Sequence, residues 1–383
     1  MSAEGRSTNV EPFPRSNGLA LRRFSLAWVT ACWLVAQAAA ADAPRVTVTP
    51  VVQRLLNPCG VAVQPGTGDV FVSESGRARV LRVVGNRGEP VISGFPLEKF
   101  TQGDSSPFEP FEIGPLGLAF TDQNTLLVGG GGLPEGADLL QVFAVPPRGG
   151  SIPADQSKQT LGPIARGRAS SSGEGDFFGV VATKKAIFAT CQGDDQQGWI
   201  ARSLQSGGTW GSLLPFTPTK KQTGVDAPMG IAINPDGQLV VAQMGELNGS
   251  RDSWLGFYDP VNGDLLASFS LPLHDVVALA YSPHEGKLYA LDFAWGQPEN
   301  QGGLFRLDAV LRDRKPAVAA TKVVQLQRPT AMAFEPKPNG NLWVTVFGRR
   351  DAADTPPDNS ADPASDPPAD TPRGSLLRIS GSL

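Results

Sequence analysis

A tetrapeptide of alternating small and apolar residues recurs six times, and this recurrence constrains the fold more than any other feature of the chain. Its copies read GVAV, GLAF, GVVA, GIAI, ALAY and AMAF, and they begin at Gly60, Gly117, Gly179, Gly230, Ala278 and Ala331. In the copy within 227–243, turn residues at 234–237 separate the tetrapeptide from a second apolar run, which predicts two short antiparallel strands. Consecutive copies start roughly 50 to 60 residues apart, and repeats of about this length built from short strands are typical of a β-propeller with four strands per blade.

The strands expected around each copy predict an all-β fold, a six-bladed β-propeller that spans residues 45–383. After the sixth copy only two more strands are expected, at 342–345 and 375–379, so the last blade lacks a fourth strand. A spare strand at 45–52 precedes the first copy. We therefore predict that this N-terminal strand pairs with the C-terminal blade and closes the ring, which leaves no open edge.

The first forty residues are typical of a signal peptide. Two arginines precede an apolar run at 24–36, and small residues follow it up to Ala41, so we expect cleavage near Ala40. The run is shorter than the ~20 residues that a membrane span needs. Two alternatives stay open: a lipobox at 29–32, which would place a lipid on Cys32, and a twin-arginine signal. All three predict export to the periplasm or the exterior.

Composition limits the partners. With 33 basic and 37 acidic residues the formal net charge is −4, which disfavours nucleic-acid binding. We expect a monomer without a membrane span that binds a small molecule, a glycan or a protein. Beyond the leader only Cys59 and Cys191 remain. Because they belong to the first and third repeats, we expect buried free thiols, with a disulfide as the alternative.

A low-complexity segment at 349–373 interrupts the sixth repeat. It is rich in aspartate, proline, alanine and serine. Its prolines are incompatible with a helix, and it has too few apolar residues to offset the entropy of ordering. We expect a disordered acidic loop within the last blade.

The rim where innermost strands begin and second strands end is the expected site, because the loops on this face are long and dissimilar. Carboxylates at these positions could hold a divalent cation such as calcium, and the candidate metal ligands are Glu74, Asp176, Asp226 and Asp292. The candidate ligand-binding residues are Asn57, Gln243, Asp275, Arg328 and Trp295. Alternatively, such Asp and Asn side chains bond the backbone of their own turns.

His274 is the candidate catalytic base, because it lies beside Asp275 at this rim. His284 is the only other histidine, and it lies in a turn. Two histidines exclude a three-histidine zinc site.

The segments 57–63 and 70–74, and their copy from Ala227, resemble NHL-type repeats. The wider group includes the senescence-marker/gluconolactonase family, whose six-bladed enzymes hold a divalent metal in the channel mouth with acidic and amide residues at the start of innermost strands. In this chain the corresponding positions are Cys59, Leu116, Phe178, Met229, Val277 and Thr330, a set that cannot hold that metal. The run at 70–83 is also similar to the opening of six-bladed sugar dehydrogenases that use a quinone cofactor.

These observations favour a binding or scaffold protein that acts through the loops of one rim. The first alternative is a metal-dependent lactonase-like hydrolase, and the second is a quinone-dependent sugar dehydrogenase.

Overall fold

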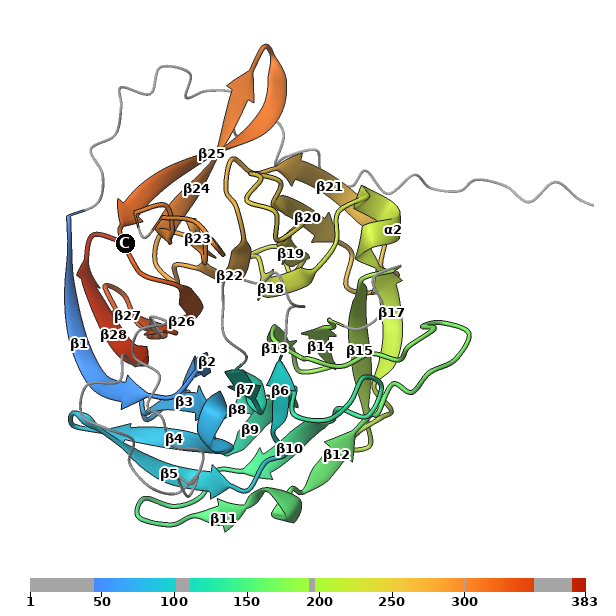
Figure 1. Ribbon diagram of the computed structural model, residues 1–383, viewed down its shortest axis with the longest axis vertical. Helices are drawn as coiled ribbons and strands as arrows, with labels where there is room; N and C mark the ends of the chain where they lie inside the picture. The colour runs from blue at the N-terminus through green and yellow to red at the C-terminus, as the bar shows by residue number, and fades with distance from the viewer. Residues whose placement is uncertain (1–44, 101–110, 193–196, 299, 348–373) are drawn as a thin grey trace, which may run out of the picture. The chain divides into compact units, whose positions relative to one another are not determined.

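The computed structural model describes residues 45–100, 111–192, 197–298, 300–347 and 374–383. The predicted leader at 1–40 and the acidic segment at 349–373 lie outside these residues. Six small antiparallel sheets, the blades, stand radially around a central channel (Figure 1). Each innermost strand contacts the innermost strand of the next blade, and the sixth contacts the first. The predicted six-bladed β-propeller is confirmed.

Each blade has four main strands, which follow one another from the channel outward. Blades 1 to 3 consist of β2 (Pro58–Val63), β3 (Val70–Glu74), β4 (Arg79–Val84) and β5 (Arg87–Ser93); β8 (Pro115–Asp122), β9 (Thr125–Gly130), β10 (Leu140–Ala144) and β12 (Gln159–Leu161); and β13 (Val180–Ala182), β14 (Ala186–Thr190), β15 (Trp199–Ser206) and β17 (Leu214–Pro218). Blades 4 to 6 consist of β18 (Pro228–Ile233), β19 (Leu239–Gln243), β20 (Trp254–Tyr258) and β21 (Leu265–Ser270); β22 (Val276–Tyr281), β23 (Leu288–Asp292), β24 (Gly303–Arg312) and β25 (Lys315–Val324); and β26 (Pro329–Phe334), β27 (Leu342–Val346), β28 (Gly374–Gly381) and β1 (Val46–Leu55).

Several short elements lie outside the four main strands of each blade. They are the strands β6 (Glu98–Phe100), β7 (Phe111–Ile113), β11 (Ile152–Pro153) and β16 (Thr209–Trp210), the helix α2 (Thr219–Thr223), and the 3₁₀ turns η2 (Ser75–Arg77) and η3 (Ala154–Gln156). Strand β11 leaves blade 2 and pairs in parallel with β5 at the outer edge of blade 1. None of the described helices is long and apolar enough to cross a membrane.

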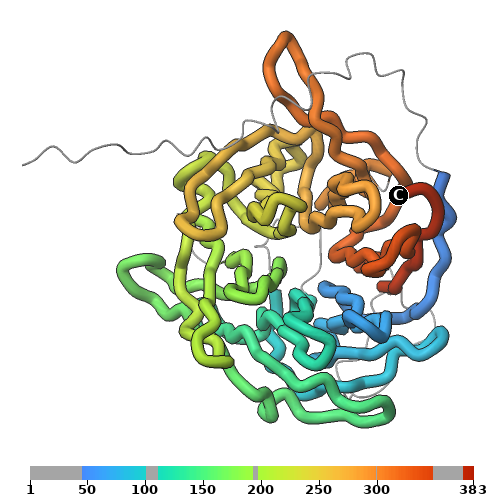
Figure 2. Tube along the Cα trace, turned by 180° about the vertical axis from the view of Figure 1, so that it is seen from behind, coloured from blue at the N-terminus to red at the C-terminus, as the bar shows by residue number. Residues whose placement is uncertain are grey.

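The ring closes as the sequence predicts. Strand β1 is antiparallel to β28, with Val46 opposite Gly381 and Leu55 opposite Gly374. Figure 2 shows the blue N-terminal strand along the outer side of the red C-terminal blade. This pairing supplies the fourth strand that the sixth repeat lacks.

The small residue of each tetrapeptide is required by close packing between blades. A Cβ atom on Gly60 would lie 2.2 Å from the carbonyl oxygen of Leu116 in blade 2, and one on Gly179 would lie 2.3 Å from the carbonyl oxygen of Met229 in blade 4. Contacts this short are forbidden for real Cβ atoms, so glycine lets the innermost strands approach one another. The repeated glycine therefore reflects the ring geometry.

Apolar side chains fill the spaces between neighbouring blades. Between blades 6 and 1, for example, Val61, Val72 and Leu81 pack with Trp343 and Leu376. All five are buried. Each blade is thus stabilised mainly by contact with its neighbours, as in other repeat architectures.

Candidate functional site

Aromatic rings from three separate parts of the chain meet on the rim where the site was expected. The hairpin β6–β7 joins blades 1 and 2 and lies at the channel side of the ring (Figure 1). The ring centroid of Phe111 in β7 lies 4.9 Å from that of Phe347 after β27, and 6.3 Å from that of Trp295 after β23. Phe100 in β6 lies 6.4 Å from Trp295. The hairpin therefore reaches blades 5 and 6 across the channel mouth.

We call Phe100, Phe111, Phe293, Trp295 and Phe347 the aromatic bridge. Phe293 is buried and stacks on Trp295, with centroids 5.2 Å apart and ring planes 24° apart. The other four rings are half-buried. Trp295 and Phe347 pack, together with Phe178 and Met244, against a buried apolar cluster that includes Phe293.

Hydrogen bonds fix the hairpin to blade 1. The side-chain amide of Asn57 donates to the carbonyl oxygen of Glu112 in β7 at 2.9 Å, and the backbone N–H of Gly114 donates to the hydroxyl of Ser75 at 2.7 Å. Asn57 adopts a left-handed conformation with φ 47°, which asparagine tolerates better than most residues. The predicted ligand-binding residue Asn57 thus positions the aromatic bridge.

Glu74, a predicted metal ligand, is fully buried and bound by two arginines. Its carboxylate oxygens lie 3.2 Å from the guanidinium of Arg77 and 2.6 Å from that of Arg79. One oxygen also accepts the backbone N–H of Leu56 at 2.9 Å. The carboxylate is therefore neutralised within its own blade.

Asp292 joins the end of β23 to the start of blade 5. Its carboxylate accepts the backbone N–H groups of His274 at 3.2 Å, Asp275 at 2.9 Å and Ala294 at 3.1 Å. The side chain is 1% exposed. These contacts agree with the alternative that acidic residues at the rim bond the backbone of turns.

His274 lies between the carboxylate of Asp292 and the guanidinium group of Arg251. Its Nδ1 is 3.5 Å from the Oδ2 of Asp292, beyond a well-formed hydrogen bond, and its Nε2 accepts from the Nε of Arg251 at 3.3 Å. To act as a general base, His274 would have to exchange the Arg251 contact for a substrate proton. That exchange is feasible because Arg251 is exposed.

Asp275 links the polar groups to the aromatic bridge. It is 2% exposed, and its carboxylate accepts the backbone N–H of Trp295. Burial raises the pKa of Asp275 to about 7, the N–H of Trp295 lowers it, and the nearby charges of Asp292 and Asp252 raise it. A carboxyl group that titrates near neutrality is thus held under Trp295.

A second acidic pair lies on blades 2 and 3. Burial raises the pKa of Asp138 to about 6, although its carboxylate accepts the backbone N–H groups of Leu133 at 3.0 Å and Asp176 at 3.1 Å. Burial, and then the charges of Asp138, Glu135 and Glu98, raise the pKa of Asp176 well above its ordinary value. Burial and these neighbouring charges thus disfavour the charged form of Asp176 that would bind a cation.

The remaining predicted residues form hydrogen bonds or ion pairs within their own blades and the adjoining loops. Asp226 forms an ion pair with Lys220 and accepts the N–H of Ala227 at 2.7 Å. Gln243 is fully buried and bridges the hydroxyl of Thr223 and a backbone carbonyl oxygen. The carbonyl oxygen of Arg328 accepts the N–H of Phe347 at 2.9 Å, which fixes the start of that ring's loop.

These contacts do not fit the divalent metal that lactonase-type propellers hold. Within the described ranges, no three His, Cys, Asp or Glu side chains are arranged to bind a metal ion. Glu74, Asp292 and Asp226 already have cationic or N–H partners. Cys59, at one of the channel positions, is a buried free thiol whose pKa burial raises to about 12. Cys191 is also free and buried, so the expectation of free thiols is confirmed.

Sequence reasoning missed four members of the aromatic bridge, since of its rings only Trp295 was a candidate. A signal was present: the copies at Gly60 and Gly117 are separated by more residues than consecutive copies from Gly179 onward, and the segment between them contains Phe100, Phe108 and Phe111. An insertion rich in phenylalanine before an innermost strand is a candidate for crossing the channel.

Comparison with known proteins identifies the fold. No protein-family model and no curated protein sequence matches the chain. Among solved structures, the chain is similar to the PQQ-bound aldose sugar dehydrogenase of Streptomyces coelicolor (16% identity, 88% of this chain and 100% of that one, TM-score 0.51). It is also similar to XC5397, a gluconolactonase of Xanthomonas campestris (15% identity, 90% and 96%, TM-score 0.52), and to the apo-form soluble aldose sugar dehydrogenase of Escherichia coli (12% identity, 88% and 100%, TM-score 0.52). At these identities the likeness shows the six-bladed β-propeller fold.

Proposed function

We propose that this protein is an exported binding protein whose rim takes a polar ring compound of the sugar or sugar-lactone class against the aromatic bridge. The observation that carries the proposal is the convergence of half-buried rings from β6, β7 and the loops after β23 and β27. Aromatic faces supply large apolar contact, and a few polar groups at their edge fix orientation.

Two further points support the ligand class. Asp275, which directly precedes β22, accepts the backbone N–H of Trp295, which follows β23, so a carboxyl group adjoins the aromatic bridge. The structures to which the chain is similar include proteins described as an aldose sugar dehydrogenase and a gluconolactonase.

Titration with sugars tests the proposal. D-glucose, cellobiose and D-glucono-1,5-lactone are titrated into the purified protein, with calorimetry and tryptophan fluorescence as readouts. We expect saturable binding that Trp295→Leu weakens at least about tenfold, because central aromatic residues carry most of the energy of a binding site.

Trp210→Leu is the matched control, since Trp210 lies in β16 on the outer part of blade 3. Absence of saturable binding to all three compounds would refute the proposed ligand class. An equal loss in both variants would show that Trp295 acts through stability alone.

Hydrolysis of a sugar lactone at the same rim is the second candidate. It is favoured by the carboxyl group of Asp275, whose pKa of about 7 suits a general base or acid at neutral pH. It ranks second because Asp275 is 2% exposed and the Nε2 of His274 is engaged by Arg251.

An assay of lactone hydrolysis separates the two candidates. Turnover that survives a chelator and is lost in Asp275→Asn would support acid–base hydrolysis by the described residues. Turnover abolished by the chelator would instead point to a metal whose ligands include residues outside them. Sugar binding without turnover of the lactone would support the binding protein over the hydrolase.

A further inference from the structure

A cleft of about 520 Å³ lies between the outer parts of blades 4 and 5, away from the aromatic bridge. One wall is the outermost strand of blade 4, β21, with Phe269 and the following residues Leu271 and Pro272. The other wall is the end of the long hairpin β24–β25, with Arg312 and Pro316. This hairpin projects beyond the ring in Figure 1. A cleft of this volume is in the range of small-molecule sites.

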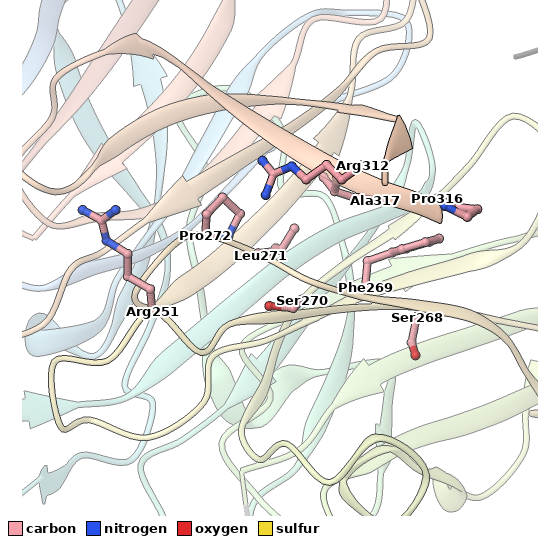
Figure 3. Close-up of a pocket in the computed structure, with 10 residues that line it drawn as sticks. Arg251, Ser268, Phe269, Ser270, Leu271, Pro272, Arg312, Pro316 and Ala317 are labelled. Carbon is pink, nitrogen blue, oxygen red and sulfur yellow. The ribbon is translucent and has the colours of Figure 1, made fainter. Parts of the chain in front are cut away.

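One end of the cleft is strongly basic. In the view of Figure 3 the guanidinium groups of Arg251 and Arg312 lie on the two sides of Pro272. None of the residues that line the cleft is acidic. The side chain of Arg312 makes no hydrogen bond or ion pair within the part of the chain that the structure describes, and the residue is exposed.

Arg251 is available to a ligand as well. Its Nε donates to His274 at 3.3 Å and one terminal nitrogen donates to the side chain of Gln301 at 3.4 Å. Both contacts are long, and neither partner is a carboxylate. Two guanidinium groups in one cleft that have no carboxylate partner among the described residues attract an anion.

The other end of the cleft is apolar. Phe269 and Pro316 lie away from the two guanidinium groups in Figure 3. Phe269 is held in place by an edge-on contact with Phe257, with centroids 6.1 Å apart and ring planes at 84°. The floor includes the fully buried Leu271.

We propose that this cleft binds an amphiphilic organic anion, whose acidic group lies between Arg251 and Arg312 and whose apolar body lies against Phe269 and Pro316. The acidic group pairs with guanidinium groups to which the described part of the chain offers no carboxylate. The apolar body covers a half-buried aromatic ring. This site adjoins the rim only through the contact of Arg251 with His274, and it does not depend on the proposed function of the rim.

His274 provides a built-in reporter. Because the Nε of Arg251 donates to the Nε2 of His274, a ligand that engages Arg251 changes the environment of that imidazole. His284 is the only other histidine of the chain and lies in the exposed turn after β22, so its ring signals serve as an internal control.

The test is an NMR titration of the two histidine rings in the purified full chain. The probe is 2-naphthalenesulfonate, its neutral analogue 2-naphthalenemethanol measures the contribution of the charge, and sulfate measures binding of the anion alone. We expect the sulfonate to shift the His274 signals saturably and to leave those of His284 unchanged. The neutral analogue should bind at least about fivefold more weakly, the effect of losing one charge-assisted contact.

Two arginine variants carry the same change in net charge. Arg312→Gln should weaken sulfonate binding about five- to tenfold. Arg314→Gln, two residues further along the same hairpin turn and outside the cleft lining, should leave it unchanged. Equal affinity for the neutral analogue, equal effects of the two variants, or no saturable shift of His274 would each overturn the proposal.

Discussion

Asp275 should make the stability of this propeller depend on pH in a direction opposite to that of most carboxylates. The perturbation is Asp275→Asn, which removes the titratable group and retains an oxygen that can accept the N–H of Trp295. In the folded protein the pKa of Asp275 is raised from 3.8 to about 7, with burial as the main cause. Between these two values the unfolded chain loses the proton while the folded protein retains it. The stabilising effect of the protonated group is therefore complete below about pH 4 and is lost as the pH rises to about 7.

The magnitude follows from the two pKa values. Linkage arithmetic with 1.36 kcal/mol per pKa unit gives a loss of about 2.5 kcal/mol from pH 5 to pH 8 through this one group. Asp138 and Asp176, whose pKa values are also raised, act in the same direction in both proteins. Their contributions cancel when the variant is compared with the wild type at each pH.

The assay is reversible urea unfolding of both proteins at pH 5, 6, 7 and 8. The variant should gain stability relative to the wild type as the pH rises, by about 2.5 kcal/mol over the whole range. Asp236→Asn, in the exposed turn of blade 4, should show a difference that is constant with pH. Parallel curves for Asp275→Asn and the wild type would refute the reasoning, since they would mean that Asp275 is ionised and solvated in the folded protein.

Two further predictions concern the frame that holds the rim. Gly60→Ala should destabilise the protein by several kcal/mol, on the order of the largest single-mutant effects, because its Cβ would lie 2.2 Å from the carbonyl oxygen of Leu116. The control in thermal unfolding is Gly167→Ala, whose Cβ would have no atom nearer than 3.7 Å. Equal melting temperatures of the two variants would contradict the packing argument. Glu74→Gln should cost about 3 kcal/mol, because it leaves Arg77 and Arg79 without their buried acidic partner; a change below about 1 kcal/mol in urea unfolding would mean that these pairs are dispensable.

The architecture was predictable because a propeller repeats one physical constraint. The tetrapeptides at Gly60, Gly117 and Gly179 begin with a residue without a side chain because two innermost strands approach closely there, and the ring repeats this need for a small residue in blades 5 and 6, where the copies begin with Ala278 and Ala331. The closure was predictable because a missing strand and a spare strand had only each other as partners. Both inferences depend on local patterns and simple counting.

The site was less predictable because it depends on contacts between distant segments. Nothing in the local sequence of Phe111 indicates Phe347 or Trp295 as neighbours. The partners of Glu74 were easier to predict from the sequence, since Arg77 and Arg79 follow it closely in the same blade. Sequence register placed Glu74 and Asp292 at the ends of second strands, where the structure has them, but it could not show that these carboxylates already had partners.

The pairing of β1 with β28 also bears on synthesis. The first strand of the domain emerges from the ribosome early, and its partner Gly374–Gly381 emerges only when nearly the whole chain has been made. Until then β1 has no partner strand and remains an exposed edge. Pro50 in this strand has no N–H to donate, which makes pairing with a strand of another molecule less favourable. A nascent chain that stops before Gly374 leaves β1 without a partner and one edge of β27 open. An incomplete product is therefore exposed to aggregation or proteolysis through the same strands that close the finished ring.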